Sequence, residues 1–284
     1  PVQIPWGRED SFRGSVDLIR QVALAWDDES GREITEYPIP SELEEDVARY
    51  REALIERAAE QDDQLMTKFL EGEDLTNEEI VRGIRLGTIR MAIYPVLCGT
   101  ALQNKGIQPL LDAITDYLPS PMDVPPIVGV VPKSGDETTR NPDTTEPFCA
   151  LAFKVVTDPF AGRLVYLRVY SGTSTAGSGV LNTTQGERER LGRVIQMHAD
   201  HREELEEAVA GNIVAAVGLK NTFTGDTICD AAHPVLLESI TFPAPVISVA
   251  IEPASRAEEE KLIDALVKLS QEDPTSVTRR DDET

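Results

Sequence analysis

The spacing of apolar residues changes near residue 146, and this change limits the folds that the chain can adopt. Before it, apolar residues recur at three- and four-residue steps, as Leu111, Ile114 and Leu118 do. After it, short apolar segments such as 148–156 are separated by turn sequences such as 224–226. The first spacing is typical of amphipathic helices and the second of antiparallel strands. The 284 residues therefore predict an α/β part followed by an all-β sandwich or closed barrel.

Residues 93–121 are typical of a strand, a loop and a helix in that order. The run 93–98 is short and apolar, which suits a buried parallel strand. Pro119 and Pro121 end the helix that follows, because proline cannot continue a helix. In an open parallel sheet, ligands bind in the loops after the strands, here residues 99–105. Most such loops bind nothing, so the residues alone favour an ordinary connection.

The first ninety residues predict short strands and then acidic helices. Ser41 with Glu44, and Thr76 with Glu79, have the spacing of capping boxes at helix starts. Residues 41–80 contain fourteen Asp and Glu residues and four Lys and Arg residues, a net charge of −10. Such a charge is usual for a solvated helical face. The alternative is an acidic docking surface for a basic partner.

The later segments divide at a stretch rich in Pro, Gly, Ser and Asp. Residues 122–145 predict an inter-domain linker, and residues 146–236 predict the β-domain. Residues 237–253 are typical of a strand, a proline break and another strand, followed by a helix that Ser255 and Glu258 would cap. The tail beyond residue 275 is expected to be mobile.

The composition excludes several functions. The formal net charge of −23 argues against a chain that coats nucleic acid, because phosphate binding needs clustered Lys and Arg. No run reaches the ~18 apolar residues of a membrane span, and no signal segment opens the chain. The three cysteines are far apart, which favours buried thiols in a reducing compartment. His198 and His201 lie three residues apart without a third ligand cluster nearby, so we expect no metal site.

Several long motifs resemble elongation factor G, the translocation GTPase. Residues 98–121 are similar to its last guanine-recognition loop and closing helix, with Thr100, Ala101 and Leu102 where the family has Ser-Ala-Leu or Ser-Ala-Phe. Residues 7–87 resemble its insert subdomain, chiefly through the motifs at 7–12 and 68–76. The second domain of elongation factor G is a translation-factor barrel. The motifs of this chain that resemble it are residues 157–164, 168–173, 197–204 and 225–227.

The resemblance implies a multidomain fold class, α/β followed by all-β. Residues 1–121 would form the C-terminal edge of a P-loop-type GTPase domain, with an α+β insert at about 7–90 and the closing strand, loop and helix at 93–121. Residues 146–236 would form the translation-factor β-barrel, domain II. Residues 237–284 would be the truncated start of domain III, the first βα unit of a ferredoxin-like fold.

The resemblance also implies a nucleotide site. The backbone N–H groups of Thr100, Ala101 and Leu102 would point at the guanine oxygen, which excludes adenine. GTP and Mg²⁺ would be the cofactors of the complete parent protein, which the family places in the cytoplasm.

The implied partner is the ribosome, with no membrane and no DNA. The acidic insert would meet the ribosomal stalk protein, with candidate contacts Glu56, Glu60, Asp62 and Asp63. Small-subunit ribosomal RNA would meet the barrel at Arg188, Arg190 and Arg193, which nearly alternate along one predicted strand.

The phosphate-binding chemistry of a GTPase is absent from these residues. A phosphate loop needs Gly-x-x-x-x-Gly-Lys-Ser/Thr, and neither it nor Asn-Lys-x-Asp nor Gly-x-Ser-x-Gly occurs in the chain. We therefore assign no catalytic residue and expect the isolated chain to bind GTP weakly or not at all and to hydrolyse none. The first residue is Pro1 rather than Met, which suggests a fragment or a processed chain.

Two functions of different classes stay open. The chain is part of a translational GTPase that moves tRNA and mRNA through the ribosome, or it is a non-catalytic ribosome-binding module that keeps only the insert and the barrel. Recycling-type and ribosomal-protection paralogues share the barrel and are further alternatives.

Overall fold

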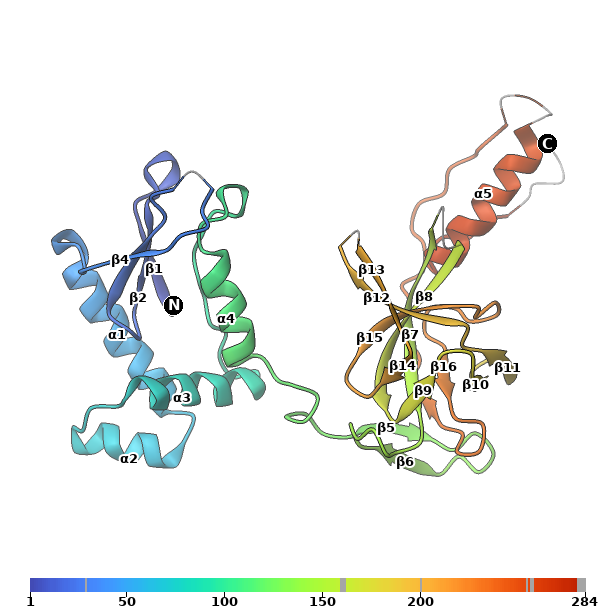
Figure 1. Cartoon of the computed structure of the whole chain (residues 1–284), viewed down its shortest axis with the longest axis horizontal. Helices are drawn as coiled ribbons and strands as arrows, with labels where there is room; N and C mark the ends of the chain where they lie inside the picture. The colour runs from blue at the N-terminus through green and yellow to red at the C-terminus, as the bar shows by residue number, and fades with distance from the viewer. Residues whose placement is uncertain (29, 159–161, 200, 254, 256–257, 280–284) are drawn as a thin grey trace. The chain divides into compact units, whose positions relative to one another are not determined.

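The computed structural model describes residues 1–28, 30–158, 162–199, 201–253, 255 and 258–279. The chain forms two compact units, Pro1–Val124 and Pro125–Thr284, which are described one at a time (Figure 1). The middle of the motif 157–164, residue 200 of the motif 197–204 and the end of the tail, 280–284, lie outside the described residues.

Unit 1 begins with a four-stranded antiparallel sheet in the order β1-β2-β3-β4. The strands are β1 (Gln3–Trp6), β2 (Gly14–Asp17), β3 (Val22–Ala25) and β4 (Thr35–Tyr37), with the short helix η1 (Glu9–Ser11) between the first two. The short strands expected in this part of the sequence are therefore confirmed. Val16, Leu18 and Ala23 of this layer are fully buried, because they face the helices.

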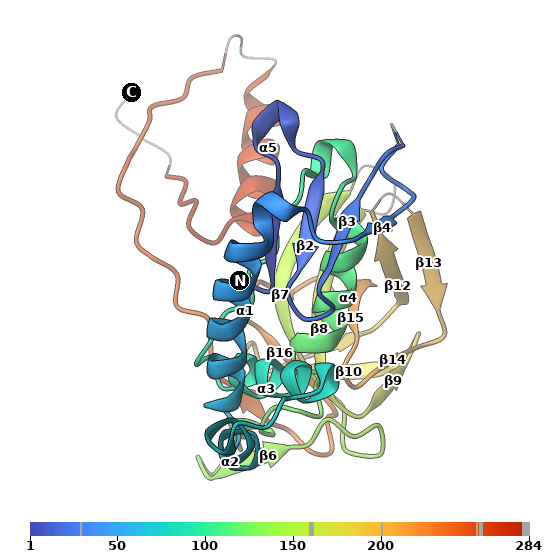
Figure 2. The ribbon, with the colours of Figure 1, turned by 90° about the vertical axis from the view of Figure 1, so that its left-hand side faces the viewer.

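The helices of unit 1 pack on this sheet and on one another. They are η2 (Ser41–Leu43), α1 (Glu44–Ala59), α2 (Asp63–Glu71), α3 (Asn77–Ile89), η3 (Ala101–Gln103) and α4 (Ile107–Tyr117). Figures 1 and 2 show α3 crossing the end of α1, and Ala58, Ile80 and Ile84 are buried in their shared core. Such burial, at about 25 cal/mol per Å² of apolar surface, stabilises helices whose outer faces are strongly charged.

One of the two predicted capping boxes forms. Thr76 accepts from the backbone N–H of Glu79 at 3.3 Å, and the Glu79 carboxylate accepts from the N–H of Thr76 at 3.0 Å. The box at Ser41 and Glu44 is wrong, because Ser41 lies inside η2 and α1 begins at Glu44 without a side-chain cap. The 3₁₀ helix η2 directly precedes α1, so the residue before α1 is Leu43, whose side chain cannot cap a helix.

The prediction of a buried parallel strand at 93–98 is wrong. This segment forms no strand, and Tyr94 and Val96 are 76% and 57% exposed. One backbone bond, from Val2 N–H to the Val96 carbonyl at 3.0 Å, ties it to the start of the sheet.

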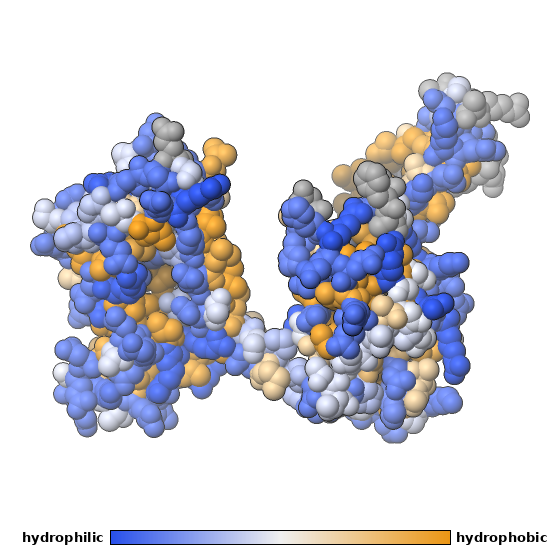
Figure 3. Space-filling view, in the orientation of Figure 1, coloured by the Kyte–Doolittle hydropathy of each residue, from blue (hydrophilic) through white to orange (hydrophobic). Residues whose placement is uncertain are grey.

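The amphipathic helix expected after residue 106 is confirmed as α4. It ends at Tyr117, and Leu118 is extended as the residue before a proline should be. Its inner side buries Ala113 and Tyr117, whereas Leu111, Ile114 and Leu118 are about half exposed. Figure 3 shows apolar side chains along this edge of unit 1.

Unit 2 is dominated by antiparallel strands, as expected. The largest sheet has the order β11-β10-β16-β7-β8-β15-β12-β13, beside the smaller sheets β14-β9 and β17-β5-β6. The strands are β5 (Ile127–Val130), β6 (Glu137–Arg140), β7 (Cys149–Asp158), β8 (Gly162–Ser171), β9 (Thr173–Thr175), β10 (Gly179–Asn182), β11 (Glu187–Arg190), β12 (Arg193–His198), β13 (His201–Leu205), β14 (Glu207–Val209), β15 (Ile213–Val217), β16 (Thr227–Cys229) and β17 (Leu236–Leu237).

The connection between β11 and β12 shows that the large sheet curls into a barrel. These strands are first and seventh in the sheet, about 29 Å apart if the sheet were flat at ~4.8 Å per strand. Arg190 and Arg193 are three Cα steps apart in the sequence, which span at most about 11 Å. The Gly192 N–H also donates to the Val217 carbonyl at 2.9 Å, so the turn after β11 joins the other end of the sheet. Of the two folds that the short strands predicted, a sandwich and a closed barrel, the curled sheet favours the barrel.

Two expectations for the flanks of the barrel do not hold in full. The linker expected at 122–145 contains the boundary between the two units, after Val124, but most of the segment belongs to unit 2. Within it, β5 and β6 pair with each other, and β5 also pairs with β17. The strands expected in 237–253 do not continue beyond β17, and Val246 and Ile247 are 94% and 81% exposed. Backbone groups need a neighbouring strand to form a ladder, and no described residue supplies one here.

The helix expected near the end of the chain is confirmed as α5 (Glu259–Glu272). Its N-cap is Glu258, which makes no side-chain capping bond, so the predicted box with Ser255 is wrong. The Glu272 carboxylate accepts from the backbone N–H of Thr157 at 2.6 Å, which fixes α5 to β7. In the described part of the chain, no helix is both long enough and apolar enough to span a lipid bilayer.

Candidate functional site

The turn at Thr100 is closed by its own backbone. Thr100 and Lys105 exchange two bonds, Thr100 N–H to the Lys105 carbonyl at 2.9 Å and the reverse at 3.2 Å. Between them, η3 makes one 3₁₀ turn, and Asn104 ends it with a φ of 61°. Asn tolerates this left-handed conformation better than most residues do, so the sequence favours a tight turn at this place.

Two glycines allow the ends of this turn to touch. A Cβ atom on Gly106, whose φ is +85°, would lie 2.8 Å from the Cys98 carbonyl oxygen and 2.9 Å from Gly99 Cα. A Cβ atom on Gly99 would lie 2.6 Å from the Lys105 carbonyl oxygen. Such distances are well inside van der Waals contact, so this backbone crossing excludes larger residues.

Trp26, Ser30 and Gly31 support the turn from outside, and the sequence did not reveal these contacts. Gln108 on α4 donates to the Gly31 carbonyl at 2.9 Å and accepts from Trp26 Nε1 at 3.2 Å. Asn104 donates to the Ser30 carbonyl at 3.4 Å. These contacts span more than seventy residues of sequence, so no local pattern could have indicated them.

The turn presents unused hydrogen-bond donors to solvent. Within the described part of the chain, the N–H groups of Ala101 and Leu102 donate to no group, because the first residues of a helix have no partner inside it. Leu102 is fully exposed and Thr100 is partly buried. Two neighbouring N–H donors on a rigid turn can recognise a carbonyl oxygen of a ligand and reject a donor in the same place.

The four predicted acidic contacts have different surroundings. Glu56 on α1 and Asp63 at the start of α2 are exposed. Glu60 pairs with Arg57 at 2.8 Å. Asp62 caps α2 by accepting from the N–H groups of Gln64 and Leu65 at 3.0 and 3.1 Å, and it pairs with Arg82 at 3.0 Å. Its spacing before α2 is a helix-start signal that sequence reasoning did not use.

The three predicted arginines do not share one strand. Arg188 and Arg190 lie on β11, whereas Arg193 lies on β12, after the fully buried Leu191. Arg190 donates to the Gly177 carbonyl at 2.8 Å, and Arg193 pairs with Glu204 at 3.1 Å. All three side chains are exposed, and Arg188 has no ion-pair partner among the described residues.

The other face of β11 anchors the segment 219–226, and this too was not foreseen. The Glu189 carboxylate accepts from the backbone N–H groups of Lys220 and Asn221 at 2.5 and 2.9 Å. Asp226, only 3% exposed, accepts from Asn182 and from the Phe223 N–H, both at 2.9 Å. Carboxylates that accept from several donors make this segment rigid.

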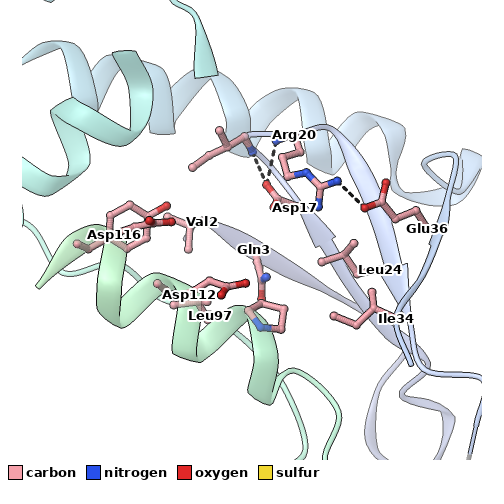
Figure 4. Close-up of a pocket in the computed structure, with 14 residues that line it drawn as sticks. Val2, Gln3, Asp17, Arg20, Leu24, Ile34, Glu36, Leu97, Asp112 and Asp116 are labelled. Carbon is pink, nitrogen blue, oxygen red and sulfur yellow. Dashed lines mark hydrogen bonds and ion pairs between the residues drawn. The ribbon is translucent and has the colours of Figure 1, made fainter. Parts of the chain in front are cut away.

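A cavity of about 280 Å³ lies in unit 1 between the sheet and α4 (Figure 4). Acidic side chains line it, including Asp17, which accepts from the N–H groups of Ile19 and Arg20, both at 2.9 Å. Arg20 also bonds to Glu36 at 2.5 Å. The residues of the Thr100 turn do not line this cavity.

Two family models match the chain. The model described as elongation factor G domain 2 matches residues 147–231, and the one described as Elongation Factor G, domain III, matches residues 242–284. The chain is elongation factor G-like. The first match covers the barrel from β7 to β16, and the second covers the segment that contains α5.

A crystal structure of a protein from Thermus thermophilus is similar to this elongation factor G-like chain over its whole length. The identity is 29% and the TM-score is 0.79. The alignment covers 100% of this chain and 40% of the Thermus chain, so the chain spans less than half the length of that protein.

The capping role of Asp62 predicts a pH dependence for unit 1. The N–H of Leu65 and the charge of Arg82 lower the pKa of Asp62 in the folded state. A lowered pKa means that the stabilisation is present above the unfolded pKa of about 3.9 and is lost as the pH falls through the folded value. Asp62→Asn should therefore be less stable than the parent at pH 7, and the difference should be smaller at pH 3, below the unfolded pKa of about 3.9. Urea unfolding followed by the fluorescence of Trp6 and Trp26 measures it.

The matched control for this prediction is Asp63→Asn, one residue away with the same change of charge. It should show a smaller difference at pH 7, because Asp63 caps nothing. An Asp62→Asn difference of the same size at both pH values would contradict the assignment.

Proposed function

We propose that this chain is part of a cytoplasmic translation elongation factor of the elongation factor G type, which drives GTP-dependent movement of tRNA and mRNA through the ribosome. The observation that carries the proposal is the order of the two family matches, domain 2 followed by domain III, along one chain. Because the two matches follow one another along the chain, the similarity is to an arrangement of domains and not to a single motif.

In this proposal unit 1 is the C-terminal part of the GTPase domain, and its turn at Thr100 recognises the guanine base. The free N–H groups of Ala101 and Leu102 would donate to the guanine oxygen, where adenine carries an amino group instead. GTP phosphates and Mg²⁺ would be held by residues that this chain lacks, because its sequence contains no phosphate loop. Alone, the chain would therefore bind GTP weakly or not at all.

The ribosome contacts follow from the exposed charges. Glu56 and Asp63 carry the proposed stalk-protein contact, because neither has an ion-pair partner among the described residues and both are exposed. Glu60 is secondary, since Arg57 already pairs with it, and Asp62 is committed to its helix. Arg188, with Arg190 and Arg193 beside it, carries the proposed contact with small-subunit RNA.

A second candidate is a non-catalytic ribosome-binding module, favoured by the absence of a phosphate loop from these residues. A ribosome-dependent GTPase assay on the full-length protein that carries this chain separates the two functions. We expect GTP hydrolysis that ribosomes stimulate, and movement of the ribosome by one codon on a primer-extension readout.

Ribosome binding without stimulated hydrolysis would contradict the GTPase and support the module. Stimulated hydrolysis without codon movement would instead support a recycling-type or ribosomal-protection paralogue. The isolated chain is the matched control, and it should hydrolyse no GTP.

The turn donors can be removed one at a time. Ala101→Pro deletes one N–H group at a helical position where proline is favoured, and Thr100 before it is already extended at φ −130° and ψ 100°. The substitution should lower the affinity of the full-length protein for GDP about tenfold, as the loss of one hydrogen bond predicts. A fluorescent guanine-nucleotide titration measures it.

Ala101→Ser keeps the N–H group and is the control, with affinity expected within about twofold of the parent. If Ala101→Pro bound GDP as tightly as the parent does, the N–H group of Ala101 would not contact the nucleotide.

A further inference from the structure

Two of the three cysteines lie directly opposite each other on neighbouring strands of the barrel. Cys149 is the first residue of β7, and Cys229 is the last residue of β16. The register of these antiparallel strands pairs Cys149 directly with Cys229. The chain separates them by eighty positions, so only the fold brings them together.

The hydrogen bonds of the ladder show which kind of pair this is. The Asp230 N–H donates to the Phe148 carbonyl at 2.9 Å, which makes Phe148 and Asp230 a hydrogen-bonded pair. Bonded and non-bonded pairs alternate along an antiparallel ladder, so the neighbouring cysteines form a non-hydrogen-bonded pair. Their Cα atoms are then about 4.5 Å apart, with both side chains on one face. A disulfide bond accepts Cα separations of roughly 4.4–6.8 Å.

The surroundings keep this pair together and shielded. Both cysteines are fully buried and pack with Val235 and Leu237 in one apolar cluster. Burial, together with the neighbouring Cys229, raises the pKa of Cys149 to about 12. Thr183 Oγ1 lies 3.0 Å from Cys229 Sγ, so its hydroxyl can donate to a thiolate there. This contact favours Cys229 as the sulfur that attacks first.

We propose that Cys149 and Cys229 are a redox-sensitive dithiol that a peroxide oxidises to a cross-strand disulfide within the barrel. Peroxide suits the site because it is small and uncharged. The Cys229 thiolate attacks one peroxide oxygen, the O–O bond breaks, and Cys229 becomes a sulfenic acid. The departing hydroxide takes up the proton that the Cys229 thiol gave up and leaves as the first water. The Cys149 sulfur then displaces that oxygen, its proton leaves with the oxygen, and water is released. Two thiols lose two electrons, and one hydrogen peroxide becomes two waters.

The disulfide would tie β7 to β16. β16 has three residues and lies between β10 and β7, so its place in the barrel depends on few backbone bonds. A disulfide that closes a long loop reduces the conformational entropy of the unfolded chain. The oxidised barrel should therefore be harder to unfold than the reduced barrel. This inference concerns the chemistry of the chain and does not depend on the proposed function.

The test uses the whole chain with Cys98→Ser, which removes the third thiol. The folded protein is treated with hydrogen peroxide, unfolded, alkylated with N-ethylmaleimide, digested without reduction and analysed by mass spectrometry. We expect one linked pair of peptides containing Cys149 and Cys229, two fewer alkylated thiols, and recovery of both thiols after dithiothreitol. The melting temperature of the oxidised protein should rise by at least about 5 °C.

Cys98→Ser/Cys149→Ser and Cys98→Ser/Cys229→Ser are the matched controls, and neither should give linked peptides or a higher melting temperature. The parent with all three cysteines keeps the test valid if a double variant fails to fold, because the same linked pair must dominate in it. Two free thiols after treatment, separate oxidation of each cysteine, or linkage only in urea would each overturn the proposal.

Discussion

Unit 1 depends on the close approach of two backbone segments, Cys98 with Gly99 on one side and Lys105 with Gly106 on the other. The approach closes the turn, sets the direction in which α4 leaves it and leaves the N–H groups of Ala101 and Leu102 without a partner among the described residues. Without that contact, the donors would belong to a flexible loop and their direction would be undefined. The recognition of a base edge needs donors that are already oriented before the ligand arrives.

Unit 2 depends instead on the curvature of its large sheet. The short connection from β11 to β12 forces the large sheet to close, which removes most of the exposed sheet edges. Glu189 and Asp226 then fix the segment 219–226 against that closed wall. Rigid loops on a closed barrel suit a domain that contacts a large partner, because little entropy is lost when such loops bind.

Several features could be predicted from the sequence because their causes are local. The helix ending at Tyr117 follows from prolines that disfavour further helix, and the box at Thr76 and Glu79 follows from two side chains on one turn. The short barrel strands follow from frequent turn residues. The Thr100 turn was identified at the right place, although its proposed ligand rests on the resemblance.

The remaining features depend on contacts that no local pattern contains. Residues 93–98 have the composition of a buried strand, but composition does not supply strands to pair with them. Arg193 looked continuous with Arg188 because a single glycine at the break, Gly192, does not show that the chain leaves the first strand of the sheet for the seventh. Gln108 supports the turn through partners more than seventy residues away. The pairing of Cys149 with Cys229 likewise required the register of two distant strands.

The backbone crossing at Gly106 is tested most directly by comparing Gly106→Ala with Gly72→Ala. Both glycines have a positive φ, +85° and +75°, but a Cβ atom at Gly72 would meet nothing within 4 Å. Both variants bear the conformational penalty of about 1–2 kcal/mol, and only Gly106→Ala adds a backbone clash. Urea unfolding followed by tryptophan fluorescence should show a loss for Gly106→Ala that exceeds the loss for Gly72→Ala by at least about 1 kcal/mol. Equal losses would contradict the account.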